Sequence, residues 1–119
     1  MNIEKSEVHG AHGVKFTAQD NGRKIGRAYL YILKNDLHAE PFGFLEDVFV
    51  EEEYRSQGIG SQLIKKAIAE SKTRGCYKLI GNSRMSNEKA HKFYERLGFK
   101  KHGFEFRMDF WVLSPLVPS

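Results

Sequence analysis

The sequence predicts an α/β protein with a mixed, mostly antiparallel central sheet and flanking helices. Three observations predict it: apolar residues alternate on both sides of an Asn-Gly pair, a strand breaks into a glycine-rich segment before a helix, and a second helix follows near the C-terminal end. Hairpin-linked strands are antiparallel, whereas strands joined through a helix can be parallel. The predicted order of elements is β-β-β-β-α-β-α-β.

The composition predicts one domain over residues 1–119, because 119 residues suffice for one hydrophobic core and not for two. A hydrophobic content of 40% argues against disorder, and no apolar run reaches the length of a transmembrane helix. The N-terminal stretch MNIEKSEVHG has no apolar signal core. We therefore expect a cytoplasmic protein that does not associate with membranes.

Metal and nucleic acid are not expected as ligands. Cys76 is the only cysteine, so it cannot form an internal disulfide or a multi-cysteine zinc site. His9 and His12 form an H-x-x-H pair in the glycine-broken HGAHG, which we interpret as a polar turn. The net charge of +4 comes from scattered basic residues, which is more typical of solvated surface than of a nucleic-acid interface.

The N-terminal half predicts four strands. Asn-Gly at positions 21 and 22 favours the positive φ angles of a tight hairpin turn, so strands are expected over residues 14–19 and 24–33. We expect a preceding strand over residues 3–9. The run FGFLEDVFV, residues 42–50, predicts a further strand that ends at three glutamates.

The C-terminal half predicts two helices. The first follows the glycine-rich segment, with Leu63, Ile64, Ala67 and Ile68 on one face and Gly75 as the stop. CYKLIGNS is expected to contain a short strand.

The second helix is expected from about Asn87, its N-cap, to Leu97, with Gly98 as the stop. The tail HGFEFRMDFWVL alternates apolar and polar residues, which predicts one or two closing strands.

The segment YRSQGIG joins a strand to a helix and is a candidate phosphate site. Gly58 and Gly60 let the backbone approach a ligand, and the amides at a helix start carry partial positive charge. No Lys-Ser or Lys-Thr follows as in a P-loop, and Leu63 stands where a dinucleotide fingerprint needs glycine or alanine. By itself the G-x-G spacing favours a structural elbow without a ligand.

Two motifs together resemble those of the GNAT superfamily of acyl-CoA-dependent N-acetyltransferases. Arg55-x-x-Gly58-x-Gly60 is similar to the pyrophosphate motif of that family. NEKAHKFYERLGF is similar to its second motif, matched at Asn87, Ala90, Phe93, Tyr94, Gly98 and Phe99. The resemblance covers roughly residues 42–110. It implies the GNAT fold and acetyl transfer from acetyl-CoA to a primary amine in a ternary complex, without a metal.

The resemblance also implies the cofactor contacts. The diphosphate would lie on the amides of residues 55–60, and the pantetheine arm between the strand before this loop and the strand near residues 78–81, which splay apart in the family. The implied contacts are Val48, Val50, Arg55, Ser56, Gln57, Gly58, Ile59, Gly60, Ser61, Asn87, Ala90 and Phe93.

Three residues are candidates for catalysis. The resemblance implies that Tyr94 is the general acid that protonates the departing sulfur, whereas an aromatic residue on an apolar helix face otherwise simply packs. Glu46 and Asp47 interrupt an apolar strand, and a buried carboxylate is costly unless it lines a wet cleft. Strand alternation directs them to opposite faces. We favour Glu46 as the general base, with Asp47 or a water relay as alternatives.

One departure from the family pattern concerns the acceptor site. GNAT proteins usually place helices between their first two strands, and HGAHG leaves no room for them. Either the acceptor cleft is open, or a second subunit closes it in a homodimer. The glutamates near the entrance predict a cationic acceptor, and an open cleft favours a peptide or protein amine over a free polyamine. The alternative is a non-catalytic CoA-binding or protein-interaction module with the same fold.

Overall fold

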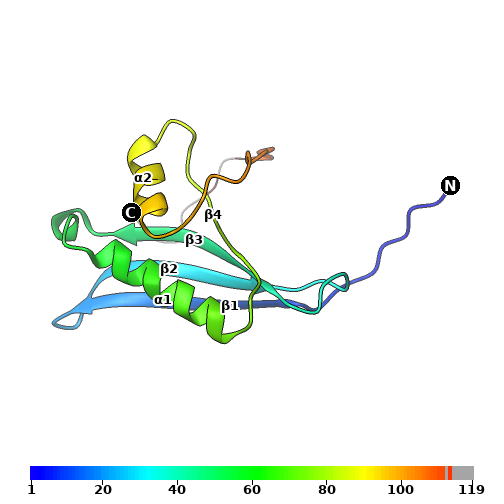
Figure 1. Ribbon diagram of the computed structural model, residues 1–119, viewed down its shortest axis with the longest axis horizontal. Helices are drawn as coiled ribbons and strands as arrows, with labels where there is room; N and C mark the ends of the chain where they lie inside the picture. Colours follow the sequence, from blue (N-terminus) through cyan, green and yellow to red (C-terminus); the bar gives the residue numbers. More distant parts are fainter. Residues whose placement is uncertain (112, 114–119) are drawn as a thin grey trace.

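The computed structural model describes residues 1–111 and 113, which form one mixed sheet and two α-helices (Figure 1). The elements are β1 (Ala11–Asp20), β2 (Arg23–Leu33), β3 (Phe42–Val50), a 3₁₀ helix η1 (Glu52–Tyr54), α1 (Ile59–Thr73), β4 (Leu79–Gly81) and α2 (Glu88–Arg96). The strands lie in the order β1-β2-β3-β4. The first three are antiparallel neighbours and β4 runs parallel to β3. The predicted fold class is confirmed.

The hairpin between β1 and β2 forms at the predicted turn. Asn21 and Gly22 have φ angles of 48° and 80°, as a tight turn between twisted strands requires. Asp20 pairs with Arg23 directly across the turn. The register then shifts between Gln19 and Ala18, where an irregularity leaves Ile25 as an extra residue on β2. The local sequence therefore sets the turn, and this irregularity sets the pairing of the rest of the two strands.

The hydrophobic core lies between one face of the sheet and α1. Its buried side chains come from both layers: Ala28, Leu30, Ile32 and Leu45 from the sheet, and Leu63, Ile64 and Ala67 from α1. Leu30 and Ile64 are fully buried. We call the sheet face opposite α1 the outer face. In the described part of the chain, neither helix covers it.

A β-bulge interrupts the pairing of β2 with β3. Arg27 pairs with Phe49, and Tyr29 pairs with Glu46. Two residues of β3, Asp47 and Val48, therefore lie opposite one residue of β2, Ala28. Asp47 has a φ angle of 50°, in the left-handed region. The bulge lets Glu46 lie on the outer face while Val48 packs against the core.

The expected strand over residues 3–9 is wrong. Residues 1–10 lie outside the sheet and extend away from it (Figure 1). The segment HGAHG does not form a turn, because Ala11, His12 and Gly13 already belong to β1. Without a reversal of direction, the preceding residues cannot fold back onto the edge of β1.

The expected closing strands are also not found where the structure describes the tail, in residues 102–111 and 113. Phe104, Phe106, Met108 and Phe110 are 72 to 92% exposed. Alternation shows which residues would share a face, but a strand forms only where a neighbouring edge satisfies its backbone groups. In the described residues this segment has no such neighbour.

Both helices end where the sequence predicts. Gly75 and Gly98 have φ angles of 75° and 101°, which terminate α1 and α2. The Asn87 side chain caps α2 by accepting a hydrogen bond from the Ala90 amide at 3.0 Å. In the described residues, no helix has both the length and the apolar composition that crossing a bilayer requires.

We expect Asn87→Ala to lower the free energy of unfolding by about 1 kcal/mol, because it leaves an amide of the first turn without its acceptor. Urea denaturation measures this change. Asn87→Asp retains a capping acceptor and serves as the matched control. Equal losses in both variants would show that the cap is not the source of the effect.

Candidate active site

β3 and its neighbour β4, the last strand of the described sheet, separate partway along β3. They pair only at Gly43–Leu79, Phe44–Ile80 and Leu45–Gly81. β3 continues beyond this point to Val50, whereas β4 ends and the chain turns away towards α2 (Figure 1). The second half of β3 therefore offers an unpaired backbone edge beside α2, as the family resemblance led us to expect.

The loop before α1 presents backbone amides at the end of this gap. Ser56 and Gly58 have φ angles of 65° and 80°, and α1 begins immediately afterwards at Ile59. In the described part of the chain, no amide from Ser56 to Ser61 donates to a protein acceptor. Exposed amides at a helix N-terminus are suited to binding phosphate oxygens.

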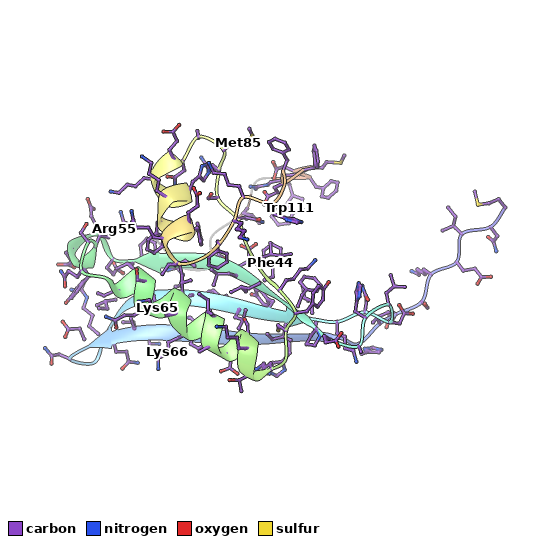
Figure 2. All side chains as sticks on the ribbon, in the orientation of Figure 1. Phe44, Arg55, Lys65, Lys66, Met85 and Trp111 are labelled. Atoms are coloured by element: carbon purple, nitrogen blue, oxygen red, sulfur yellow. The ribbon has the colours of Figure 1, made fainter. Side chains whose placement is uncertain are left out.

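A hydrogen bond from the Arg55 side chain connects this loop to the end of β3. Its Nε donates to the Val50 carbonyl oxygen at 2.8 Å, and its guanidinium lies 5.4 Å from the centre of the Phe49 ring. The side chain itself is exposed, as are Ser56 and Gln57 (Figure 2). The predicted diphosphate residues thus form one continuous exposed turn.

α2 packs against the start of α1 at the second glycine. A Cβ atom on Gly60 would lie 3.6 Å from Cζ of Phe93 and 3.9 Å from Cγ2 of Val50. Phe93 and Val50 therefore lie next to the start of α1, and the second motif lies directly beside the first. Asn87 is the N-cap of α2, and its side chain accepts the hydrogen bond from the Ala90 amide in the first turn.

Tyr94 lies at the point where the two strands separate. Its ring packs edge-on against Phe99, with ring centres 5.3 Å apart, and a Cβ atom on Gly81 would lie 3.4 Å from its Cε1. Burial raises the pKa of the Tyr94 phenol, and the nearby Glu46 carboxylate raises it further. The phenol is therefore protonated at neutral pH and can act as an acid.

Glu46 is a partly buried carboxyl group on the outer face of β3. Burial raises the pKa of Glu46 from its ordinary value, and the negative charges of Asp47 and Glu105 add to this effect. A raised pKa makes Glu46 a stronger base than an exposed carboxylate. Asp47, the alternative base, is exposed at the bulge.

The structure adds two neighbours of Glu46 that the sequence analysis did not identify. Tyr29 lies directly across from it on β2, and Glu105 of the tail contributes to its raised pKa. No signal in the sequence could have identified Tyr29 as a neighbour, because the bulge shifts the register between the two strands.

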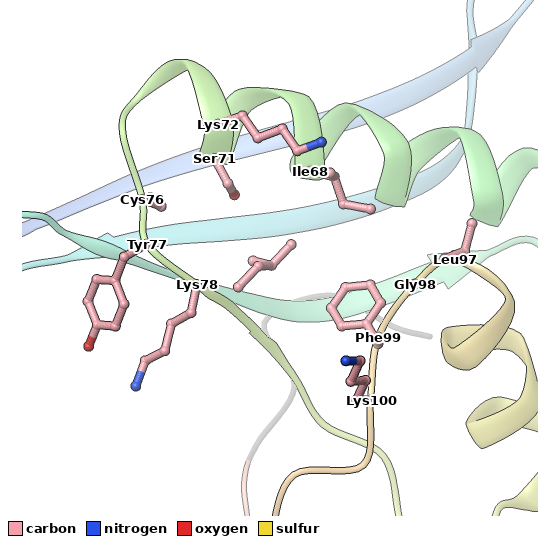
Figure 3. A pocket seen from close by; sticks show the side chains of 11 residues that line it. Ile68, Ser71, Lys72, Cys76, Tyr77, Lys78, Leu97, Gly98, Phe99 and Lys100 are labelled. Carbon is pink, nitrogen blue, oxygen red and sulfur yellow. The ribbon is translucent and has the colours of Figure 1, made fainter.

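A separate pocket of about 450 Å³ lies beside the C-terminal part of α1 and the start of β4 (Figure 3). Its lining includes Ile68, Ser71, Lys72, Cys76, Tyr77, Lys78, Leu79, Leu97, Gly98, Phe99 and Lys100. Neither Glu46 nor Tyr94 belongs to it. Burial raises the pKa of the Cys76 thiol, which disfavours its thiolate form.

The described residues contain no cluster of three His, Cys, Asp or Glu side chains that could hold a metal ion. The groups at the gap are instead backbone amides, a carboxyl group and a phenol. These can bind an anion and transfer protons.

Comparisons with known proteins agree with this arrangement. Residues 2–99 match the model of the acetyltransferase (GNAT) family. The chain is 40% identical over 95 residues to glucosamine 6-phosphate N-acetyltransferase of Trypanosoma brucei brucei, covering 79% of this chain and 63% of that protein. It is 35% identical over 97 residues to N-alpha-acetyltransferase 30 of Schizosaccharomyces pombe, covering 80% of this chain and 63% of that protein.

Among solved structures, the chain is similar to AAC(6')-Iy in complex with the bisubstrate analog CoA-S-monomethyl-acetylneamine. The TM-score is 0.68 at 27% sequence identity, over 82% of this chain and 70% of that one. The chain thus spans less than two thirds of the length of the two curated relatives described above. The family match covers most of the sequence, and it includes the loop and the helix that flank the gap. The chain therefore belongs to the GNAT family of acetyltransferases.

Proposed function

We propose that the protein transfers an acetyl group from acetyl-CoA to a primary amine by direct attack in a ternary complex. The observation that carries this proposal is the gap between β3 and β4, with unpaired loop amides at one end and Glu46 and Tyr94 beside it. The CoA-containing analog bound by a structural relative supports acetyl-CoA as the donor.

Each side chain has one task in the proposed reaction. The amine nitrogen attacks the thioester carbonyl carbon, a C–N bond forms and the C–S bond breaks. Glu46 first accepts one proton from the ammonium group, directly or through a water molecule, so that the nitrogen that attacks is a neutral amine. As the intermediate collapses, the nitrogen loses a second proton to water and Tyr94 gives its proton to the departing sulfur. The amides from Ser56 to Ser61 bind the diphosphate and thereby fix the thioester beside the second half of β3.

The acceptor is proposed to be a primary amine that reaches Glu46 as a cation. The two curated relatives differ in the amine that their names give, glucosamine 6-phosphate in one and an N-alpha amine in the other. In the described residues no helix covers the outer face, which supports an extended acceptor such as a peptide or protein amine. A homodimer that closes this face would favour a small amine instead. The cytoplasmic location stays a prediction.

The test is release of free thiol from acetyl-CoA with a panel of amines, among them a lysine-rich peptide, spermidine and aminoglycosides. We expect turnover with at least one amine, and slower turnover at high salt, because salt screens the attraction between the ammonium group and Glu46. The rival function is a non-catalytic CoA-binding or protein-interaction module, which is favoured by the lack of a helix over the outer face in the part of the chain that the structure describes. Binding of CoA without thiol release would support that module.

We expect Glu46→Gln to reduce kcat/KM about a hundredfold at neutral pH, the usual scale for loss of a general base. The raised pKa means that Glu46 becomes an effective base only as the pH rises through that value. In the wild type, kcat/KM should therefore increase with pH across this window, and the variant should lose this increase. Rates measured from mildly acidic to neutral pH test both statements.

Asp47→Asn is the matched control, because asparagine tolerates the positive φ angle at the bulge. We expect it to change kcat/KM by about twofold or less, within the range of surface substitutions. A large loss in Asp47→Asn with a normal Glu46→Gln would reassign the base to Asp47. Normal rates in both variants would support a water relay.

A further inference from the structure

The outer face of the sheet is aromatic and basic around Glu46. By register and alternation, its side chains are Lys15, Arg27, Tyr29, Tyr31, Phe44, Glu46 and Phe49. Tyr29 and Tyr31 lie nearly parallel, with ring centres 6.4 Å apart and an interplanar angle of 7°. Tyr31 is 40% exposed, and the side chains of Tyr29, Phe44 and Phe49 are partly exposed in the described residues, so the rings form a surface that a ligand can contact.

Two basic side chains are held over this surface. Nζ of Lys15 lies 5.3 Å from the centre of the Tyr29 ring, and the guanidinium of Arg27 lies 4.6 Å from that of Phe49. A cation above a ring face is attracted by the ring, which limits the positions of a flexible side chain. Neither Lys15 nor Arg27 forms an ion pair within the described residues, so both charges remain available.

The register relates these cations to Glu46. Lys15 pairs with Tyr29, and Tyr29 pairs with Glu46, so the three lie in one row across β1, β2 and β3. Arg27 lies in the neighbouring row, opposite Phe49. Two strand spacings separate the ends of the first row, roughly 10 Å at the Cα atoms. A small molecule can span this distance.

We propose that Lys15 and Arg27 form a subsite for an anionic group, phosphate or carboxylate, on the acceptor whose amine reacts at Glu46. This inference rests on the proposed acetyl transfer and specifies its substrate. The acceptor is an amine at one end and an anion at the other, with its middle part lying on Tyr29. Arg27 and Lys15 match the anion, and Glu46 matches the ammonium group, so the charges on the face fix the orientation of the acceptor.

The first experiment compares pairs of amines that differ only in the anionic group: glucosamine 6-phosphate with glucosamine, O-phosphoethanolamine with ethanolamine, and lysine with cadaverine. The wild type should have a higher kcat/KM for the anionic member of at least one pair, by about tenfold to a hundredfold, the scale of a charged hydrogen bond. If members of these pairs are acetylated and no anionic member is preferred, the subsite is refuted.

The second experiment asks which side chains produce the preference. Lys15→Gln with Arg27→Gln should abolish it, mainly by raising KM, and should leave kcat/KM for the neutral members within about twofold. Lys66→Gln is the matched control, since this exposed lysine lies on α1, on the other side of the sheet (Figure 2). A preference that survives in the double variant would place the anion elsewhere and overturn the assignment.

Calorimetric binding of the same pairs to the CoA-saturated protein separates this inference from the proposed reaction. Tighter binding of an anionic member, lost in the double variant, would support the subsite even if no amine released thiol. That combination would refute acetyl transfer and keep the subsite. Turnover of both members of every pair at equal rates and with equal affinity would support acetyl transfer and refute the subsite.

Discussion

Replacement of Tyr94 by phenylalanine is expected to reduce kcat about a hundredfold or more, the usual scale for a general acid. The variant deletes only the hydroxyl group and keeps the ring that packs against Phe99. The structure gives no protein partner to the hydroxyl in the described residues, so its loss should not disturb the fold. Thiol release under saturating acetyl-CoA measures kcat, and a thermal melt measures stability.

Two observations would distinguish catalysis by Tyr94 from packing. Tyr77→Phe removes a phenol from an exposed ring far from Glu46 and should leave kcat unchanged. The affinity for acetyl-CoA should remain near the wild-type value in Tyr94→Phe, because only the departing thiolate requires the proton. A fall in stability with unaltered kcat would assign Tyr94 to the core alone.

Gly58→Val is expected to abolish stabilisation of the protein by CoA. In the wild type, CoA at about 100 times its dissociation constant should stabilise the fold by about 2.7 kcal/mol. Gly58 has a φ angle of 80° with open space around it, so valine meets no atomic clash but strongly disfavours this backbone conformation. Relaxation of the turn would misdirect the amides of the helix start. Denaturation with and without CoA measures the effect.

Gly58→Asn is the control for conformation, because asparagine enters the left-handed region at lower cost. It should retain most of the stabilisation by CoA. Gly60→Leu should lose it for another reason, since branches beyond the Cβ would collide with Phe93 and Val50. Full stabilisation in Gly58→Val and Gly60→Leu would contradict the assignment of the diphosphate to this loop.

The sequence predicted best the features that depend on neighbouring residues. The Asn21-Gly22 turn, the Asn87 cap and the glycine stops after both helices all occur as predicted. Each depends on a local φ preference or on a hydrogen bond within one helical turn. The motifs around Gly58 and Tyr94 also indicated the family, and the structure brings these segments together. The roles of their residues stay predictions.

The strand predictions were wrong where a segment needed a pairing partner that is distant in the chain. We expected strands over residues 3–9 and, because apolar and polar residues alternate there, in the tail, yet no described strand edge pairs with either segment. Alternation defines two faces of a segment and gives no information about which edge is available or whether the chain can turn towards it.

By itself the sequence determined the order of most elements, the ends of the helices and the glycine-rich turn, because local backbone preferences fix these features. Only the tertiary structure decided the row of Lys15, Tyr29 and Glu46 on one sheet face. That row depends on the register of three strands and on the bulge at Asp47. Register follows from the packing of whole strands against α1, because a shift of one residue would exchange the buried and exposed side chains of each strand.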